Sequence, residues 1–181
     1  MKRLTIAACV SLLAGCTVTE YPYPKSWDAL AVPESSDCRE ILGTYADRGE
    51  SGSVGSESPS LALQLFGPNS DWEKAVNVNF SFPSEGALQV TVLGKNGPLF
   101  SRTLTKKDDE YLCKSGRARL RGRRWITTDL VSGRQTVVLE ITGLEKYLVA
   151  KVNEETYGTL FVLVPIAGTA QHWYRFPRVA R

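Results

Sequence analysis

Histidine is almost absent from this chain of 181 residues, which contains only His172. The sequence also has no G-x-S-x-G, H-E-x-x-H, P-loop or C-x-x-C motif. Adjacent acids occur at Asp108–Glu110 and Glu154–Glu155, in turn-like stretches where neighbouring carboxylates are normally solvated. We therefore expect no enzyme, no cofactor and no metal ion. A hydrolase that combines His172 with a distant nucleophile and acid is an alternative.

Long apolar runs are also lacking, and the one short run lies at the start of the chain. Lys2 and Arg3 precede the uncharged stretch Leu4–Leu13, which is too short to span a bilayer and matches a secretory signal. The stretch ends in Leu13-Ala14-Gly15-Cys16, which resembles the lipobox of bacterial lipoproteins. A core helix that happens to hold a cysteine is the alternative.

The lipobox resemblance implies an address and a lipid partner. It implies a signal peptide at 1–15 and acylation of Cys16, which would anchor the chain in membrane lipid because several acyl chains hold far more firmly than one. Thr17 follows the cysteine where an aspartate would favour the inner membrane, so the resemblance implies the bacterial outer membrane, facing the periplasm. Residues 16–37 would then form a lipidated tether, and 38–181 a single β domain.

The remaining charge and cysteines limit the function further. Without Lys2 and Arg3, 22 − 2 = 20 basic side chains face 19 acidic ones, so overall charge gives no argument for a polyanion, and we expect no nucleic acid partner. Cys9 leaves with the signal and Cys16 carries lipid, which leaves Cys38 and Cys113. In an oxidising periplasm we favour a Cys38–Cys113 disulfide, with a metal pair or a reactive thiol as alternatives.

The expected tether contains three prolines and mixed polar residues, without a lasting apolar period. Its aromatic residues Tyr21, Tyr23 and Trp27 lie close to the anchor along the chain. They could occupy the headgroup region, as interfacial aromatics do. Packing of Trp27 onto the domain is equally compatible with the sequence.

Beyond the tether, short alternating segments separated by turn residues predict an all-β fold. We expect an antiparallel meander that forms a small barrel or a strongly curved sheet. Ser60 could cap a helical turn over 60–66, and Asn96-Gly97 is the clearest hairpin signal. A turn at Ser132-Gly133 is also expected. The strands are expected within 38–50, 76–82, 88–92, 99–105, 111–125, 125–131, 135–141, 147–153, 156–164 and 172–176.

Three short segments are similar to a group of uncharacterised proteobacterial outer-membrane lipoproteins. They are C-x-x-I-x-G-x-Y-x-x-x-G-E at Cys38–Glu50, S-L-x-x-x-L-F at Ser60–Phe66 and W-Y-R-F at Trp173–Phe176. The group supplies no activity to transfer. Gly43-x-Tyr45 also faintly resembles the G-x-W opening of lipocalins, which slightly favours a barrel.

Arginines concentrate in one stretch, with five among the eleven residues Ser115–Trp125. On a strand, alternate side chains share a face at a spacing of about 6.5 to 7 Å. We therefore expect a cationic ladder on one face of the strand, formed by Arg117, Arg119, Arg121 and Arg123. Arg124 is expected on the other face. The ladder could bind phosphates or carboxylates of an anionic lipid, glycan or envelope protein. The alternative is a solvated face whose charges meet Asp129 or Glu140.

The sequence thus supports one function best, with two alternatives. The first is an anchored binding or scaffolding module of the cell envelope. The second is a lipocalin-like carrier of an apolar or amphiphilic ligand, whose cavity would be lined by Val78, Phe80, Val90 and Val92. The third is the hydrolase built around His172.

Overall fold

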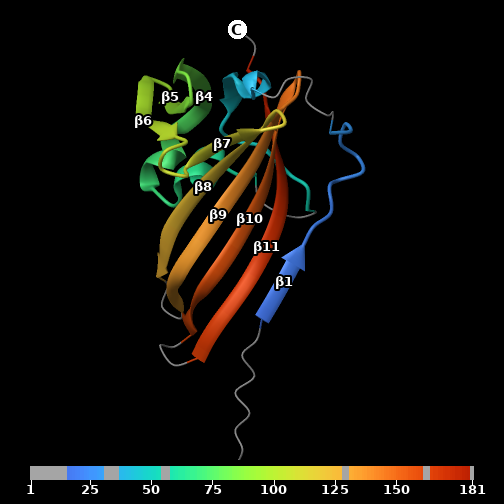
Figure 1. Cartoon of the computed structure of the whole chain (residues 1–181), viewed down its shortest axis with the longest axis vertical. Coiled ribbons are helices and arrows are strands. Elements are labelled where there is room, and N and C mark those ends of the chain that lie inside the picture. Colours follow the sequence, from blue (N-terminus) through green and yellow to red (C-terminus); the bar gives the residue numbers. More distant parts are fainter. Residues whose placement is uncertain (1–15, 31–36, 54–57, 128–130, 161–163, 180–181) are drawn as a thin grey trace, which may run out of the picture.

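Two open β-sheets form the fold, which is known from a computed structural model (Figure 1). The structure describes residues 16–30, 37–53, 58–127, 131–160 and 164–179. The first sheet, sheet A, has the strand order β1-β11-β10-β9-β8-β7, with β3 also pairing with β11. The second, sheet B, has the order β2-β4-β5-β6. The expected all-β fold is confirmed, as an open curved architecture and not as a closed barrel.

Sheet A is built around three long neighbouring strands. These are β9 (Val131–Gly143), β10 (Tyr147–Leu160) and β11 (Val164–Pro177), joined as antiparallel neighbours. On one side β9 pairs with β8, and on the other side β11 pairs in parallel with β1. The remaining strands of this sheet are β8 (Arg117–Thr127), β7 (Tyr111–Lys114), β3 (Glu50–Ser51) and β1 (Cys16–Glu20).

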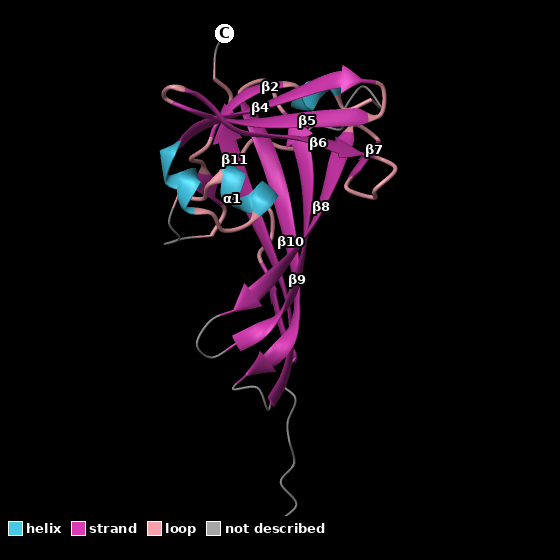
Figure 2. Ribbon diagram, turned by 90° about the vertical axis from the view of Figure 1, so that its left-hand side faces the viewer, coloured by secondary structure: helices cyan, strands magenta, loops and turns pink. Residues whose placement is uncertain are grey.

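Sheet B is an antiparallel meander that crosses one end of sheet A, as Figure 2 shows. Alternate residues of its strands face inward, and Val78, Phe80, Val90 and Val92 are at most 1% exposed. They pack in one cluster with sheet A residues such as Leu139. The strands of this sheet are β2 (Gly43–Ala46), β4 (Ala75–Ser84), β5 (Ala87–Gly94) and β6 (Gly97–Thr105).

Within the described ranges, three short helical segments connect the sheets. The predicted helical turn is α1 (Leu61–Phe66), and the Ser60 side chain caps it by accepting a hydrogen bond from the Leu63 amide. Ser60 Oγ also donates to the buried carboxylate of Asp47, at 3.0 Å. The 3₁₀ segments are η1 (Arg39–Ile41) and η2 (Ser70–Lys74).

Several turn predictions can be compared with the observed register. The Asn96-Gly97 hairpin forms between β5 and β6, with Gly94 paired to Gly97, so that Lys95 and Asn96 occupy its tip. The turn expected at Ser132-Gly133 is wrong, because both residues lie inside β9. The expected single strand 111–125 is divided by a turn at Ser115-Gly116, where both residues have positive φ. The two strands expected over 147–164 are one strand up to Leu160.

The described residues of the expected tether lie against the β domain, which is the alternative that the sequence left open for Trp27. Cys16–Glu20 forms β1 and pairs with Ala167–Gln171 of β11, so the residue that is expected to be acylated begins a strand. Trp27 packs against the Arg175 guanidinium at 4.9 Å, which places it on the domain and not apart from it. The Cys38–Cys113 disulfide is confirmed, with the two Cα atoms 6.0 Å apart.

One half of sheet A projects beyond the hydrophobic core. In β10, Leu148, Ala150 and Val152 are fully buried, whereas Tyr157 is 59% exposed. Figure 2 shows the corresponding ends of the long strands as a narrow twisted ribbon below sheet B. The core therefore lies at one end of the molecule, and the far strand ends form a projection that we call the tip.

Candidate functional site

The arginine ladder has the geometry that its spacing predicts. Arg117, Arg119, Arg121 and Arg123 are exposed, while Ala118 and Leu120 beneath them are buried. The ladder lies on β8, which is the edge strand of sheet A beyond its short pairing with β7. It therefore borders the opening between the two sheets.

The fifth arginine, Arg124, lies on the opposite face in a polar network. Its guanidinium donates to Glu154 Oε1 at 3.1 Å, and it also contacts Gln135 Oε1. The Gln135 amide donates to Glu154 Oε2 at 3.0 Å. Since both charged side chains are about one fifth exposed, this pair is better shielded from solvent than a surface salt bridge.

The rungs of the ladder differ in their partners. Arg121 pairs with Asp109 at 2.8 Å. Arg119 lies opposite Glu140 in register and lines a shallow groove that also contains Glu20 and Glu155. Among the described residues, Arg117, Arg119 and Arg123 have no carboxylate within salt-bridge distance. Asp129, the other acid expected to meet the ladder, lies outside the described residues.

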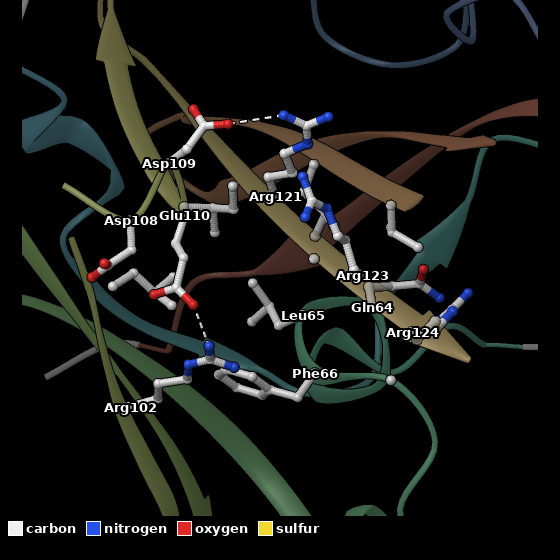
Figure 3. Close-up of a pocket in the computed structure, with 16 residues that line it drawn as sticks. Gln64, Leu65, Phe66, Arg102, Asp108, Asp109, Glu110, Arg121, Arg123 and Arg124 are labelled. Atoms are coloured by element: carbon white, nitrogen blue, oxygen red, sulfur yellow. Dashed lines mark hydrogen bonds and ion pairs between the residues drawn. The ribbon is translucent and has the colours of Figure 1, made fainter. Parts of the chain in front are cut away.

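A cleft of about 320 Å³ opens beside Arg121 and Arg123 of the ladder. Its floor is apolar, with Leu104 from β6, Leu120 from β8 and Leu139 from β9. The C-terminal end of α1 forms one wall. Figure 3 shows the mouth, where β6, the β6–β7 turn and β8 bring charged side chains together, namely Arg102, Asp108, Asp109, Glu110, Arg121, Arg123 and Arg124.

Most charges at the mouth are compensated, but Asp108 and Arg123 have no partner of opposite charge among the described residues. Arg102 pairs with Glu110, Arg121 with Asp109, and Arg124 with Glu154 outside the cleft. Asp108 accepts a hydrogen bond from Thr105 Oγ1 at 2.6 Å. Arg123 is left as an exposed guanidinium without a carboxylate partner in the described part of the chain. An anion at the mouth would therefore meet an available donor above an apolar floor.

The residues expected to line a carrier cavity do not line this cleft. Val78, Phe80, Val90 and Val92 pack in the core between the sheets. The cleft lies instead at the sheet edges, where sequence reasoning identified only Arg121 and Arg123. Arg102 was not identified, and Asp108–Glu110 were interpreted as solvated turn residues, because their approach to β8 depends on how the strands pack.

His172, the centre of the hydrolase alternative, lies in an aromatic stack. Its ring centroid is 5.3 Å from that of Tyr21 and 6.0 Å from that of Tyr174. Burial, together with the nearby charge of Glu154, raises the pKa of Tyr174. These ring contacts give His172 a packing role at the edge of β11.

Two of the three aromatic residues expected near the anchor, Tyr23 and Trp27, pack onto the face of β11 opposite to His172. Tyr23 contacts Trp173 edge to face at 5.0 Å, and it also contacts Trp27. Arg175 lies between the rings of Trp27 and Tyr147, at 4.9 Å from each centroid. The chain after β1 is thereby fixed across β11, on the side away from the cleft.

Comparisons of the chain with family models, with curated proteins and with solved structures found no match. In the part of the chain that the structure describes, no helix has the length and apolar character needed to cross a bilayer. The described histidine, cysteine and acidic residues also form no group of three that could hold a metal ion. The class is therefore defined by the fold and the site alone, as a two-sheet β protein with an arginine-lined cleft.

Proposed function

We propose that this protein is a lipid-anchored binding module of the bacterial outer membrane, facing the periplasm, that takes an anionic amphiphile into the cleft beside β8. The lipobox-like Leu13-Ala14-Gly15-Cys16 supports the anchor. The cleft supports the ligand class, because its apolar floor suits an acyl chain and its mouth suits a phosphate or carboxylate.

One observation carries the ligand class: Arg123 stands at the mouth of the cleft without a carboxylate partner among the described residues. A guanidinium presents two parallel N–H donors that match phosphate and carboxylate oxygens. The neighbouring Arg121 is paired with Asp109, which leaves Arg123 as the available guanidinium at the mouth. The leucines beneath gain free energy when an apolar chain replaces water, at about 25 cal/mol per Å² buried.

Binding of dodecyl phosphate, measured by calorimetry below its micelle concentration, tests the ligand class. We expect Arg123→Ala to weaken binding about tenfold or more, because hydrogen bonds to charged groups contribute roughly 1.5–3 kcal/mol. Arg117→Ala is the matched control, since Arg117 lies on the same face of β8 but does not line the cleft. Equal binding by wild type and Arg123→Ala would contradict the proposal, and so would equal binding of dodecyl maltoside.

The anchor has a separate test. Cells grown with an alkyne fatty acid should label the wild-type chain, and Cys16→Ala should abolish the label. Cys9→Ala is the control, because Cys9 lies within the apolar run of the expected signal. A label that persists in Cys16→Ala, or that depends on Cys9, would contradict acylation at Cys16.

A further inference from the structure

Five strands of sheet A place one residue each in a single row at the tip. Trp125 pairs with Arg134, Arg134 with Tyr157, Tyr157 with Ala167, and Ala167 with Cys16. Directly paired residues of neighbouring strands share a face of the sheet, so Trp125, Arg134 and Tyr157 project on the same side. The row spans four strand spacings, or about 19 Å. We call these five residues the anchor row.

Two large aromatic side chains in this row are exposed to solvent. Trp125 is 66% exposed and Tyr157 is 59% exposed. The other tryptophans differ, since Trp27 and Trp173 contact Tyr23 or Arg175, and Trp72 is only 6% exposed. Trp125 and Tyr157 lie on the side of the molecule that holds Cys16, and neither belongs to the hydrophobic core of the described chain.

We propose that the anchor row is a membrane contact, with Trp125 and Tyr157 in the headgroup region of the lipid bilayer that holds Cys16. This inference rests on the proposed acylation. Because Cys16 is the first residue of β1, no described tether separates the lipid from the sheet. Acyl chains on Cys16 bring the whole row to the bilayer surface.

The chemistry of the row fits that surface. The amphipathic rings of Trp and Tyr are enriched where apolar chains meet headgroups. Arg134, between them, is exposed and can bind a lipid phosphate. In the next row, Arg123 follows at about 7 Å along β8, within the reach of the surface potential of anionic lipids.

Tryptophan quenching tests the contact. The purified acylated protein is placed in vesicles of phosphatidylethanolamine and phosphatidylglycerol that contain a phosphatidylcholine brominated near its headgroup. We expect the emission to fall by up to about a quarter, the share of one tryptophan in four, because only Trp125 reaches the interface. Trp125→Phe should abolish this quenching. Trp27→Phe, which removes a tryptophan packed on β11, should retain it.

Flotation of the same vesicles separates the contact from the anchor. Protein that floats with the vesicles but shows no quenching, or quenching that survives in Trp125→Phe, overturns the membrane contact and leaves the anchor intact. Quenching of Trp125 in a chain that carries Cys16→Ser supports the contact independently of acylation. Absence of both flotation and quenching in the wild-type chain overturns both proposals.

Discussion

Tyr45 links the C-terminal segment to sheet B. The phenol is buried and donates a hydrogen bond to the Ile41 carbonyl at 3.1 Å. The guanidinium of Arg178 covers the ring at 4.9 Å and donates to the carbonyls of Glu40 and Leu42 at 2.7 and 2.8 Å. Burial raises the pKa of Tyr45 to about 12, although the positive charge of Arg178 opposes that rise.

This pKa predicts a loss of stability in alkali. The folded state favours the neutral phenol, so its contribution is fully present below about pH 10 and is lost as the pH rises towards about 12. The loss attributable to Tyr45 is about 2 to 3 kcal/mol. Urea unfolding of wild type and Tyr45→Phe checks it. The difference in unfolding free energy should stay constant from about pH 7 to 9 and then move against wild type. A difference that remains constant up to pH ~11.5 would contradict this role of burial.

At the scale of elements, two facing glycines let β9 and β10 approach closely near the tip. Gly133 pairs with Gly158. A Cβ atom built on Gly133 would lie 2.3 Å from the Tyr157 carbonyl oxygen and 2.6 Å from the Gly158 Cα, which real structures do not permit. The close approach accompanies the strong twist of the ribbon seen in Figure 2.

Gly133→Ala should therefore destabilise the projecting part of sheet A. We expect a loss of about 1–3 kcal/mol, the usual cost of forcing extra atoms into a packed site, and faster amide hydrogen exchange in the tip halves of β9 and β10. Gly122→Ala is the matched control on β8, because the nearest atom to its added Cβ, the Leu65 carbonyl oxygen, is 3.9 Å away. Equal free energies of unfolding for the two variants would show that β9 and β10 can move apart without loss of stability.

The sequence predicts some elements of this fold correctly and others wrongly, and Gly133 shows the reason for one wrong prediction. Val78, Phe80, Val90 and Val92 alternate with polar residues, so local pattern alone predicts their strands and inward faces. Ser132-Gly133 carries the composition of a turn, but the glycine is needed for a cross-strand approach that only the pairing reveals.

The candidate site was predictable only in part for a similar reason. The period of two places four arginines on one face of β8. It carries no information on which of these arginines acquires a partner, since Asp109 reaches Arg121 from the β6–β7 turn. The pairing of β1 with β11 likewise brings Cys16 beside residues that are more than a hundred positions away in the chain.

At the scale of the whole molecule, the long strands connect two ends with different properties. One end contains the core, the crossing sheet B and the Cys38–Cys113 disulfide. The other end contains the anchor row. The cleft lies between them at the β8 edge, and Arg123, at its mouth, is two residues from Trp125. With the anchor row at the bilayer, the mouth of the cleft opens close to the lipid surface from which an amphiphile would enter.

This orientation predicts a gradient of lipid contact along β8. A photoreactive benzophenone residue is introduced at Thr127, Arg123 or Arg117 of the acylated protein in vesicles. Thr127 and Arg117 are ten residues apart on one face, or about 33 Å.

We expect crosslinks to phospholipid to be strong at Thr127, weaker at Arg123 and absent at Arg117, because the sheet rises from the membrane at its tip. Labelling at Lys106, in the β6–β7 turn of the core end, should match that at Arg117. Equal crosslinking at all positions would mean that sheet A lies flat on the membrane, and the reverse gradient would mean that the core end faces the lipid.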